Sequence, residues 1–296
     1  MKAVIPFLLL LLLSSCSQLP LKSLPSPNYN DRVKFLVLHF TAEDFAGSVR
    51  ALVSEHQVSS HYLIPQHHDP SYPYSRLAVF QLVPEDKRAW HAGVSYWQGR
   101  EDLNDTSIGV EIVNQPDCQP PPYPDGRRQC QYPAFDPEQI SLVVRLAQQI
   151  LARHPDIGPT QVIGHADIAP DRKDDPGPRF PWQQLYQAGV GAWYEQDTRA
   201  RYRQAFGQRP LPLPILQQAL ADYGYRLQVT GSADRQTRDV LLAFQMHFLP
   251  QAVSGKPDLD TAATIFALLS KYFPEKAATL WAAYQQAEII PAPPEN

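Results

Sequence analysis

The sequence predicts a layered α/β or α+β domain followed by a smaller, wholly helical unit. Three observations predict this. Short apolar runs rich in β-branched residues alternate with segments of helical periodicity up to about residue 182, helical periodicity alone follows Pro210, and 296 residues exceed the roughly 100–200 of a single domain. The net charge of -4, without a basic run, gives no electrostatic footprint for nucleic acid.

The N-terminus has the form of an export signal. Lys2 precedes an apolar run over residues 4–13, which is too short to span a bilayer and matches the apolar region of a signal peptide. We therefore expect residues 1–15 to be a signal peptide and the rest of the chain to be exported.

A cysteine closes this signal. The segment Leu13-Ser14-Ser15-Cys16 resembles the bacterial lipobox, whose cysteine becomes the lipidated N-terminus of the mature protein. Ser17 follows, and by resemblance to sorting in Gram-negative bacteria a residue other than aspartate favours the outer membrane. Residues 16–32 would then be a lipidated tether for a body that faces the periplasm. An unlipidated signal sequence with a chance cysteine is the alternative.

Five short apolar runs are predicted to be strands. The first of them ends at His39, and the last leads directly into Gly164-His165. Because strand ends and the loops after them commonly hold functional residues, both histidines become candidates for a site. The runs cover residues 33–38, 62–64, 78–83, 107–113 and 161–163.

The clearest helix is predicted over residues 138–154. Asp136 is the expected N-cap, Pro137 suits the first helical position, and Pro155 stands just beyond the end. A second helix is expected over residues 48–57. The apolar face of the longer helix consists of Ile140, Val143, Val144, Ala147, Ile150 and Leu151.

Beyond residue 185 the pattern changes. We expect a catalytic domain over residues 33–185, a polar connector over 186–209 in which residues 190–208 could form a helix, a small three-helix domain over 210–275 and a C-terminal tail over 276–296. The three helices are predicted from apolar stripes: Leu213, Leu216, Leu220 and Tyr223; Val240, Leu241 and Phe244; Leu259, Ala262, Phe266 and Leu269.

The proline-rich loop 164–178 suggests a metal site. It holds His165 and, ten residues later, Asp175. With His39 these form a two-histidine, one-carboxylate set, which matches an open catalytic zinc site that leaves one position for water. Taken singly, each histidine could instead be a satisfied core or edge residue. The other carboxylates of the loop, Asp167, Asp171 and Asp174, are expected to shape the loop or to be solvated.

Two further residues could act on a substrate beside such a metal. Glu111 shares a strand face with Gly109 and Val113, where period-two alternation places it among apolar neighbours. It could serve as general base toward the attacking water and acid toward the leaving nitrogen, or it could form a structural ion pair. Lys173 could stabilise an oxyanion, or it could be a solvated surface lysine.

Export also affects the reading of Cys118 and Cys130. An oxidising compartment permits disulfides, and the segment between the two cysteines has turn residues but little to bury. We expect the two to pair. A free pair or a metal site is the alternative.

Five motifs in order carry a family resemblance. The chain resembles the zinc-dependent N-acetylmuramoyl-L-alanine amidases of the type 2 amidase family, which also includes phage T7 lysozyme amidase and the peptidoglycan recognition proteins. That resemblance implies an α/β fold with a central mixed sheet flanked by helices. The motifs are Val37-Leu38-His39-Phe40-Thr41, Ser60-His61-Tyr62-Leu63-Ile64, Ala89-Trp90-His91-Ala92-Gly93, Ile108-Gly109-Val110-Glu111-Ile112, and the loop from Gly164-His165 to Lys173-Asp174-Asp175-Pro176-Gly177-Pro178.

The resemblance also implies residue roles. One zinc ion per chain would be held by His39, His165 and Asp175, with Glu111 as the catalytic glutamate and Lys173 as the oxyanion-stabilising lysine. Because its third ligand would be an aspartate, the chain resembles the branch of the family that contains the bacterial recycling amidase and an outer-membrane lipoprotein amidase. Motif positions that line the substrate groove in the family fall on His61, Trp90 and His91.

The C-terminal region resembles the three-helix peptidoglycan-binding domain found beside cell-wall hydrolases. The resemblance rests on Gln228-Val229-Thr230-Gly231, Thr237 and Ala243-Phe244-Gln245. A generic helical bundle is the alternative, since an apolar stripe at helical spacing is usually core.

Together these features predict a hydrolase that cleaves the amide between N-acetylmuramic acid, anhydro forms included, and L-alanine of the stem peptide. Its partners would be peptidoglycan, muropeptides and, through Cys16, the membrane; nucleic acid is not expected, and we expect a monomer. A non-catalytic recognition protein of the same fold is one alternative. A glycosidase is another, which would need two carboxylates flanking a sugar and no metal.

Overall fold

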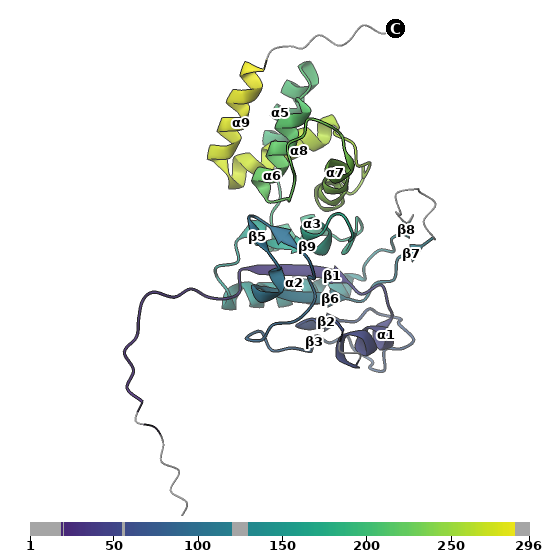
Figure 1. Ribbon diagram of the computed structural model, residues 1–296. Coiled ribbons are helices and arrows are strands. Elements are labelled where there is room, and N and C mark those ends of the chain that lie inside the picture. Colours follow the sequence, from purple (N-terminus) through teal and green to yellow (C-terminus); the bar gives the residue numbers. More distant parts are fainter. Residues whose placement is uncertain (1–18, 20, 55–56, 120–129, 288–296) are drawn as a thin grey trace, which may run out of the picture. The chain divides into compact units, whose positions relative to one another are not determined.

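The computed structural model describes residues 19, 21–54, 57–119 and 130–287 (Figure 1). The chain divides at Asp31, and the described residues from Asp31 onward form one compact unit. The described residues before Asp31 are exposed and form neither helix nor strand. Cys16 and the predicted signal peptide lie outside the described residues. No helix in the described part of the chain has the length and apolarity to cross a bilayer.

A five-stranded mixed sheet forms the centre of the compact unit. Its strands lie in the order β3-β2-β6-β1-β9, with β3 antiparallel to β2 and the other neighbours parallel. This confirms the predicted α/β architecture with a central mixed sheet. The strands are β1 (Phe35–Phe40), β2 (Tyr62–Ile64), β3 (Phe80–Gln81), β6 (Ser107–Ile112) and β9 (Val162–Gly164).

Strands β1 and β6 are buried almost throughout, as expected of parallel strands covered on both faces. Their register sets His39 beside Glu111, and β9 pairs with the other edge of β1. Because these strands are parallel, their carboxyl ends meet at one edge of the sheet. The register therefore brings together the two strand ends that carry the candidate site residues.

Helix α2 (Pro137–Arg153) begins as predicted. The Asp136 carboxylate accepts hydrogen bonds from the backbone N–H groups of Glu138 and Gln139, and Pro137 occupies the first turn. The predicted second helix starts earlier, as α1 (Phe45–Val49), and continues as a π-helical turn over Arg50–Ser54. The remaining short elements are β4 (Tyr96–Trp97), β5 (Arg100–Glu101), β7 (Asp117–Cys118), β8 (Cys130–Gln131), α3 (His165–Ile168), α4 (Trp182–Gln187) and 3₁₀ turns over Leu103–Asp105 and Pro159–Gln161.

The C-terminal region is helical, but its described part has more than the three predicted helices. The apolar stripes correspond to α6 (Leu213–Tyr223), α7 (Arg235–Phe248) and α8 (Leu259–Tyr272). The expected connector contains α5 (Gln196–Gln208), and the expected tail begins with α9 (Pro274–Gln286). Both additional helices pack against α8. The polar connector is thus helical over most of its length, and both it and the segment expected to be the tail pack onto the predicted helices.

The sheet and the C-terminal helices share one hydrophobic core. Trp97 is buried, and its ring packs edge-on against Tyr223 and Tyr225 at centroid distances of 6.0 and 4.8 Å. Trp182 stacks on His247 of α7 at 3.8 Å. The helical region thus packs onto the α/β layer as part of the same folded body.

Candidate metal centre

Three buried side chains converge at the carboxyl edge of the sheet. His39 Nδ1 lies 3.0 Å from His165 Nδ1 and 2.9 Å from Asp175 Oδ2, and His165 Nδ1 lies 3.2 Å from the same oxygen. A tetrahedral zinc ion with bonds of about 2.0–2.1 Å separates its ligand atoms by roughly 3.3 Å, so the spacing and the donor types both fit this ion. The predicted ligand set is confirmed as a group of three metal-capable donors.

Local structure explains why the three donors meet. His39 stands near the end of β1, and His165 opens α3 directly after β9. The loop then returns, and the Ala166 N–H donates to the Asp175 carbonyl at 2.8 Å. This backbone bond ties the segment of the third donor to that of the second.

A chain of hydrogen bonds orients His39. Its Nε2 lies 3.0 Å from His91 Nδ1, His91 Nε2 lies 3.1 Å from Ser107 Oγ, and that hydroxyl donates to the Leu103 carbonyl at 2.7 Å. We assign the protons from this network: Nε2–H of His39 donates to His91, and Nε2–H of His91 donates to Ser107. His39 Nδ1 is then left with a lone pair toward the metal position.

A backbone carbonyl group orients the ring of His165 in a similar way. Its Nε2–H donates to the Ala92 carbonyl at 3.0 Å, which fixes the tautomer with Nδ1 free. Arg172 Nη2 donates to the same carbonyl at 2.7 Å and to the Val94 carbonyl at 2.6 Å.

Burial and neighbouring side chains together set the charge states that a metal needs. It lowers the pKa of His39 to about 4, so the imidazole is neutral at pH 7. Burial opposes ionisation of Asp175, but the neighbouring His165 and His39 outweigh it and hold the pKa of this carboxyl well below its usual range. Neutral imidazole and ionised carboxylate are the forms that coordinate a cation.

Glu111 and Lys173 line the same cavity as the three donors, a cleft of about 1300 Å³. Burial, and then the charge of Asp175, raises the pKa of Glu111 well above its usual value. A carboxyl group so placed keeps its proton to a higher pH than an exposed glutamate does. Lys173 is half-buried and follows Arg172 on the loop that leads to Asp175.

The three predicted groove residues have different positions. His91 lines the cleft, although its ring nitrogens face His39 and Ser107. His61 is fully buried outside the cleft lining, where its Nδ1 accepts from the Gly109 N–H and its Nε2 donates to the Lys87 carbonyl. Trp90 is 54% exposed and also lies outside that lining. The ring of His61 packs against that of His91 and does not reach the cleft lining, so its contact with a substrate stays a prediction.

Sequence reasoning missed Ser107 and the reason for Gly109. A Cβ at residue 109 would lie 2.4 Å from the His91 ring, so only glycine leaves room for this histidine. Ser107, Gly109 and Glu111 alternate along β6 and therefore share a face. Extending the predicted face by two residues toward the start of the strand would have found the serine.

The remaining loop carboxylates, expected to shape the loop or to be solvated, have different surroundings. Asp167 is 2% exposed and accepts three hydrogen bonds, so it is not solvated. Asp174 accepts from the Tyr132 hydroxyl at 2.6 Å, and burial raises its pKa. Asp171 is exposed, as expected.

A disulfide joins Cys118 and Cys130, with an S–S distance of 2.06 Å. The two cysteines pair β7 with β8 and line the cleft. Residues 120–129, between them, lie outside the described residues. The hairpin places Tyr132 beside Asp174, next to the third metal donor.

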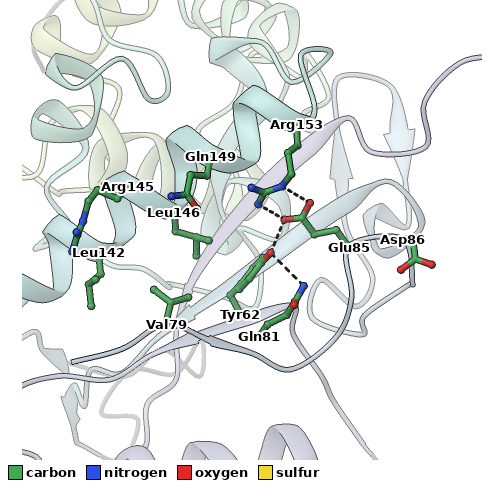
Figure 2. Close-up of a pocket in the computed structure, with 10 residues that line it drawn as sticks. All are labelled: Tyr62, Val79, Gln81, Glu85, Asp86, Leu142, Arg145, Leu146, Gln149 and Arg153. Carbon is green, nitrogen blue, oxygen red and sulfur yellow. Dashed lines mark hydrogen bonds and ion pairs between the residues drawn. The ribbon is translucent and has the colours of Figure 1, made fainter. Parts of the chain in front are cut away.

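A second cavity of about 680 Å³ lies between β2 and α2, and Figure 2 shows its lining. Glu85 accepts from the Tyr62 hydroxyl at 2.6 Å, from Arg153 Nη2 at 2.7 Å and from His154 Nε2 at 2.8 Å. These donors outweigh the effect of burial and lower the pKa of Glu85 to about 2. Side chains of the protein itself satisfy this carboxylate, so we interpret the cluster as one that stabilises the fold and not as a ligand site.

Two family models match the chain. The model for N-acetylmuramoyl-L-alanine amidase matches residues 29–178, which include all five motifs and the metal donors. A model for a peptidoglycan-binding domain matches residues 213–265, within the C-terminal helices.

Characterised relatives match much of the chain. N-acetylmuramoyl-L-alanine amidase AmiD of Escherichia coli is 44% identical over 81% of this chain and 84% of its own. The crystal structure of AmpDh3 from Pseudomonas aeruginosa has a TM-score of 0.79 and 46% identity, covering 86% of this chain and 99% of that chain. AmiD in complex with anhydro-N-acetylmuramic acid-L-Ala-D-γ-Glu-L-Lys has a TM-score of 0.72 and 43% identity, covering 84% and 93%.

Proposed function

The chain belongs to the N-acetylmuramoyl-L-alanine amidase family, and from that premise we propose that it is a zinc enzyme acting on anhydro-muropeptides of the cell envelope. The chain is an amidase for the bond between muramic acid and L-alanine. One observation carries the proposal: the buried donors of His39, His165 and Asp175 open onto a cleft that Glu111 also lines.

The substrate proposal is supported by two relatives. AmpDh3 has been crystallised with an anhydromuramic pentapeptide and AmiD with an anhydro-N-acetylmuramic acid peptide. Both share more than 40% of their residues with this chain over most of its length. We propose that the sugar and stem peptide lie along the cleft with the scissile amide at the three donors.

The proposed roles of the side chains follow from their positions in the cleft beside the three donors. A zinc ion at the three donors would supply Lewis-acid polarisation of the carbonyl and lower the pKa of a water. Glu111 takes the proton of the attacking water and delivers it to the alanine nitrogen as the amide breaks. Its raised pKa makes the ionised carboxylate a stronger base than an exposed glutamate, which favours acceptance of the proton from water.

Lys173 would donate to the oxygen that becomes negative when the amide carbonyl is attacked. It is half-buried, lines the cleft and lies two residues before Asp175. A fixed cation near a developing oxyanion stabilises the transition state more than the neutral ground state.

The place of action follows from the N-terminal motif and the relatives. We propose a lipoprotein attached to the outer membrane through Cys16 and facing the periplasm, where residues 31–296 act as a monomer. Support comes from the lipobox-like segment, the disulfide and the similarity to AmiD. The C-terminal helices would contribute to binding of peptidoglycan, as the family model for residues 213–265 suggests.

The test uses soluble protein lacking residues 1–16 and a defined anhydro-muropeptide. We expect mass spectrometry to detect the free stem peptide with N-terminal alanine, and we expect a chelator to abolish its release until zinc is restored. Cleavage between sugars, or undiminished release in chelator, would contradict the proposal. A non-catalytic recognition protein would bind the muropeptide and release nothing.

A further inference from the structure

The carboxylate of Asp167 links the metal centre to the C-terminal helices. It is 2% exposed and lies in α3, the four-residue helix that begins with the metal donor His165. Asp167 Oδ2 accepts from the Gly164 N–H at 2.8 Å, so the side chain reaches back to the residue before this histidine. The carboxylate therefore braces the turn from which His165 projects.

Two side chains from the C-terminal region hold this carboxylate in turn. His247 Nδ1 on α7 lies 2.8 Å from Asp167 Oδ2, and the Tyr225 hydroxyl donates to Oδ1 at 2.6 Å. His247 is 4% exposed and Tyr225 is 1% exposed, so neither bond competes with water. Among the described residues His247 Nε2 has no hydrogen-bond partner, which agrees with a tautomer whose proton sits on Nδ1 and points at Asp167.

Packing leaves the two donors little freedom. The His247 ring is stacked on Trp182 at 3.8 Å and on Phe248 at 3.9 Å, and Tyr225 packs edge-on against Trp97 at 4.8 Å. Trp182 also adjoins residue 164, because a Cβ there would lie 3.3 Å from its ring. A carboxylate with buried, rigid donors on both oxygens cannot rotate without losing hydrogen bonds that nothing replaces.

We propose that His247 and Tyr225 are positioning residues for the metal ligand His165, acting through Asp167. The C-terminal helices, besides any contact with peptidoglycan, then form part of the scaffold of the metal centre. This inference rests on the proposed zinc site. Outer partners of metal ligands typically change metal affinity about 10–100-fold when removed, and these two act one residue further out, so we expect about 3–10-fold.

The test measures zinc affinity of the soluble protein by competition with a chromophoric chelator. His247→Leu removes the donor and keeps an apolar side chain, whereas His247→Asn restores an N–H near the position of Nδ1. Tyr225→Phe removes only the hydroxyl. We expect the zinc Kd to rise about 3–10-fold in His247→Leu, somewhat less in Tyr225→Phe, and to return close to the parent value in His247→Asn.

Tyr284→Phe is the matched control. Its hydroxyl donates to the Arg209 carbonyl at 2.7 Å and is 4% exposed as a residue, so the variant loses a comparable buried hydrogen bond in the same helical region without touching Asp167. We expect a lowered Tm without a change in zinc Kd. The visible spectrum of the cobalt-loaded protein, which reports ligand geometry, should shift in His247→Leu and not in Tyr284→Phe.

Asp167→Ala, which removes both acceptor oxygens, tests whether the effect passes through this carboxylate. If it does, adding His247→Leu to Asp167→Ala weakens zinc binding no further. Should His247→Leu fail to fold, the zinc Kd of Tyr225→Phe tests the inference instead. Parent-like zinc Kd in Tyr225→Phe and His247→Leu, or equal weakening in Tyr284→Phe, would overturn this inference alone. A parent protein that binds no zinc would overturn the zinc assignment with it.

Discussion

Three residues on one face of β6 have different roles at the metal centre. Ser107 accepts the last hydrogen bond of the chain that runs from His39 through His91. Gly109 leaves room for the His91 ring, and Glu111 lines the cleft. Only the last of these is proposed to touch substrate. The other two act by fixing the direction of a metal donor.

Glu111→Gln separates chemistry from metal binding. The amide is nearly isosteric but can neither accept nor deliver a proton, so we expect kcat to fall about 10²–10⁴-fold. Zinc content, measured by atomic absorption, should stay at one ion per chain, because Glu111 is outside the donor set. Retained kcat would remove Glu111 from the mechanism, and lost zinc would make it a ligand.

His91 is predicted to control the affinity for the metal. In His91→Ala the Nε2–H of His39 loses its acceptor, and the ring of His39 loses a packed neighbour at 5.1 Å. We expect the zinc Kd to rise about 10–100-fold. His91→Asn, which keeps an acceptor near the Nδ1 position, should recover part of that loss. If both variants bound zinc like the parent, the hydrogen bonds from His39 through His91 would have no role in holding the metal.

At the scale of elements, β2 and α2 are joined through Glu85. Its folded pKa of about 2 lies below the usual 4.5, so its ionised form stabilises the fold at pH values above about 4.5. That contribution is lost as the pH falls from about 4.5 to about 2. Burial and charged partners make the loss of its hydrogen bonds worth about 2 kcal/mol.

We therefore expect Glu85→Gln to lower the free energy of unfolding by about 2 kcal/mol at pH 7, and the difference from the parent to shrink toward pH 2. Urea unfolding at several pH values measures this. Asp86→Asn is the control, because Asp86 is exposed and its ion pair among the described residues is with the exposed Lys87. This substitution should change stability little. If the difference grew toward low pH instead, the ionised form of Glu85 would not be the one that stabilises the fold.

Elements with a strong local pattern could be predicted from sequence. The buried strands and the capped helix α2 have continuous apolar runs or a full apolar stripe, and the three metal donors stand at motif positions. The packing of α5 against α8 could not be predicted, because α5 buries only Phe206 and pairs its arginines with Asp260 of α8. Asp167 had no local signal either, since Tyr225 and His247 lie 58 and 80 residues away.

At the scale of the whole molecule, the shared core argues against two independent domains. Trp97 and Trp182 belong to the α/β layer and are 1% and 4% exposed, and their packing partners include Tyr223, Tyr225 and His247 from the C-terminal helices. Separating the two parts would expose large aromatic surfaces on both, at about 25 cal/mol per Å². Neither part is expected to unfold while the other remains native.

Calorimetry of the soluble protein lacking residues 1–16 should accordingly show one transition, with equal calorimetric and van't Hoff enthalpies. Zinc binds only the folded form, so saturating zinc should move the whole transition upward, by about 2.7 kcal/mol of stability at 100 times the Kd. Chelation should reverse the shift, since the buried donors then lose their cation. Two transitions, with zinc raising only one of them, would mean that the C-terminal helices melt independently of the metal centre, and the link through Asp167 could not then hold His165 in place.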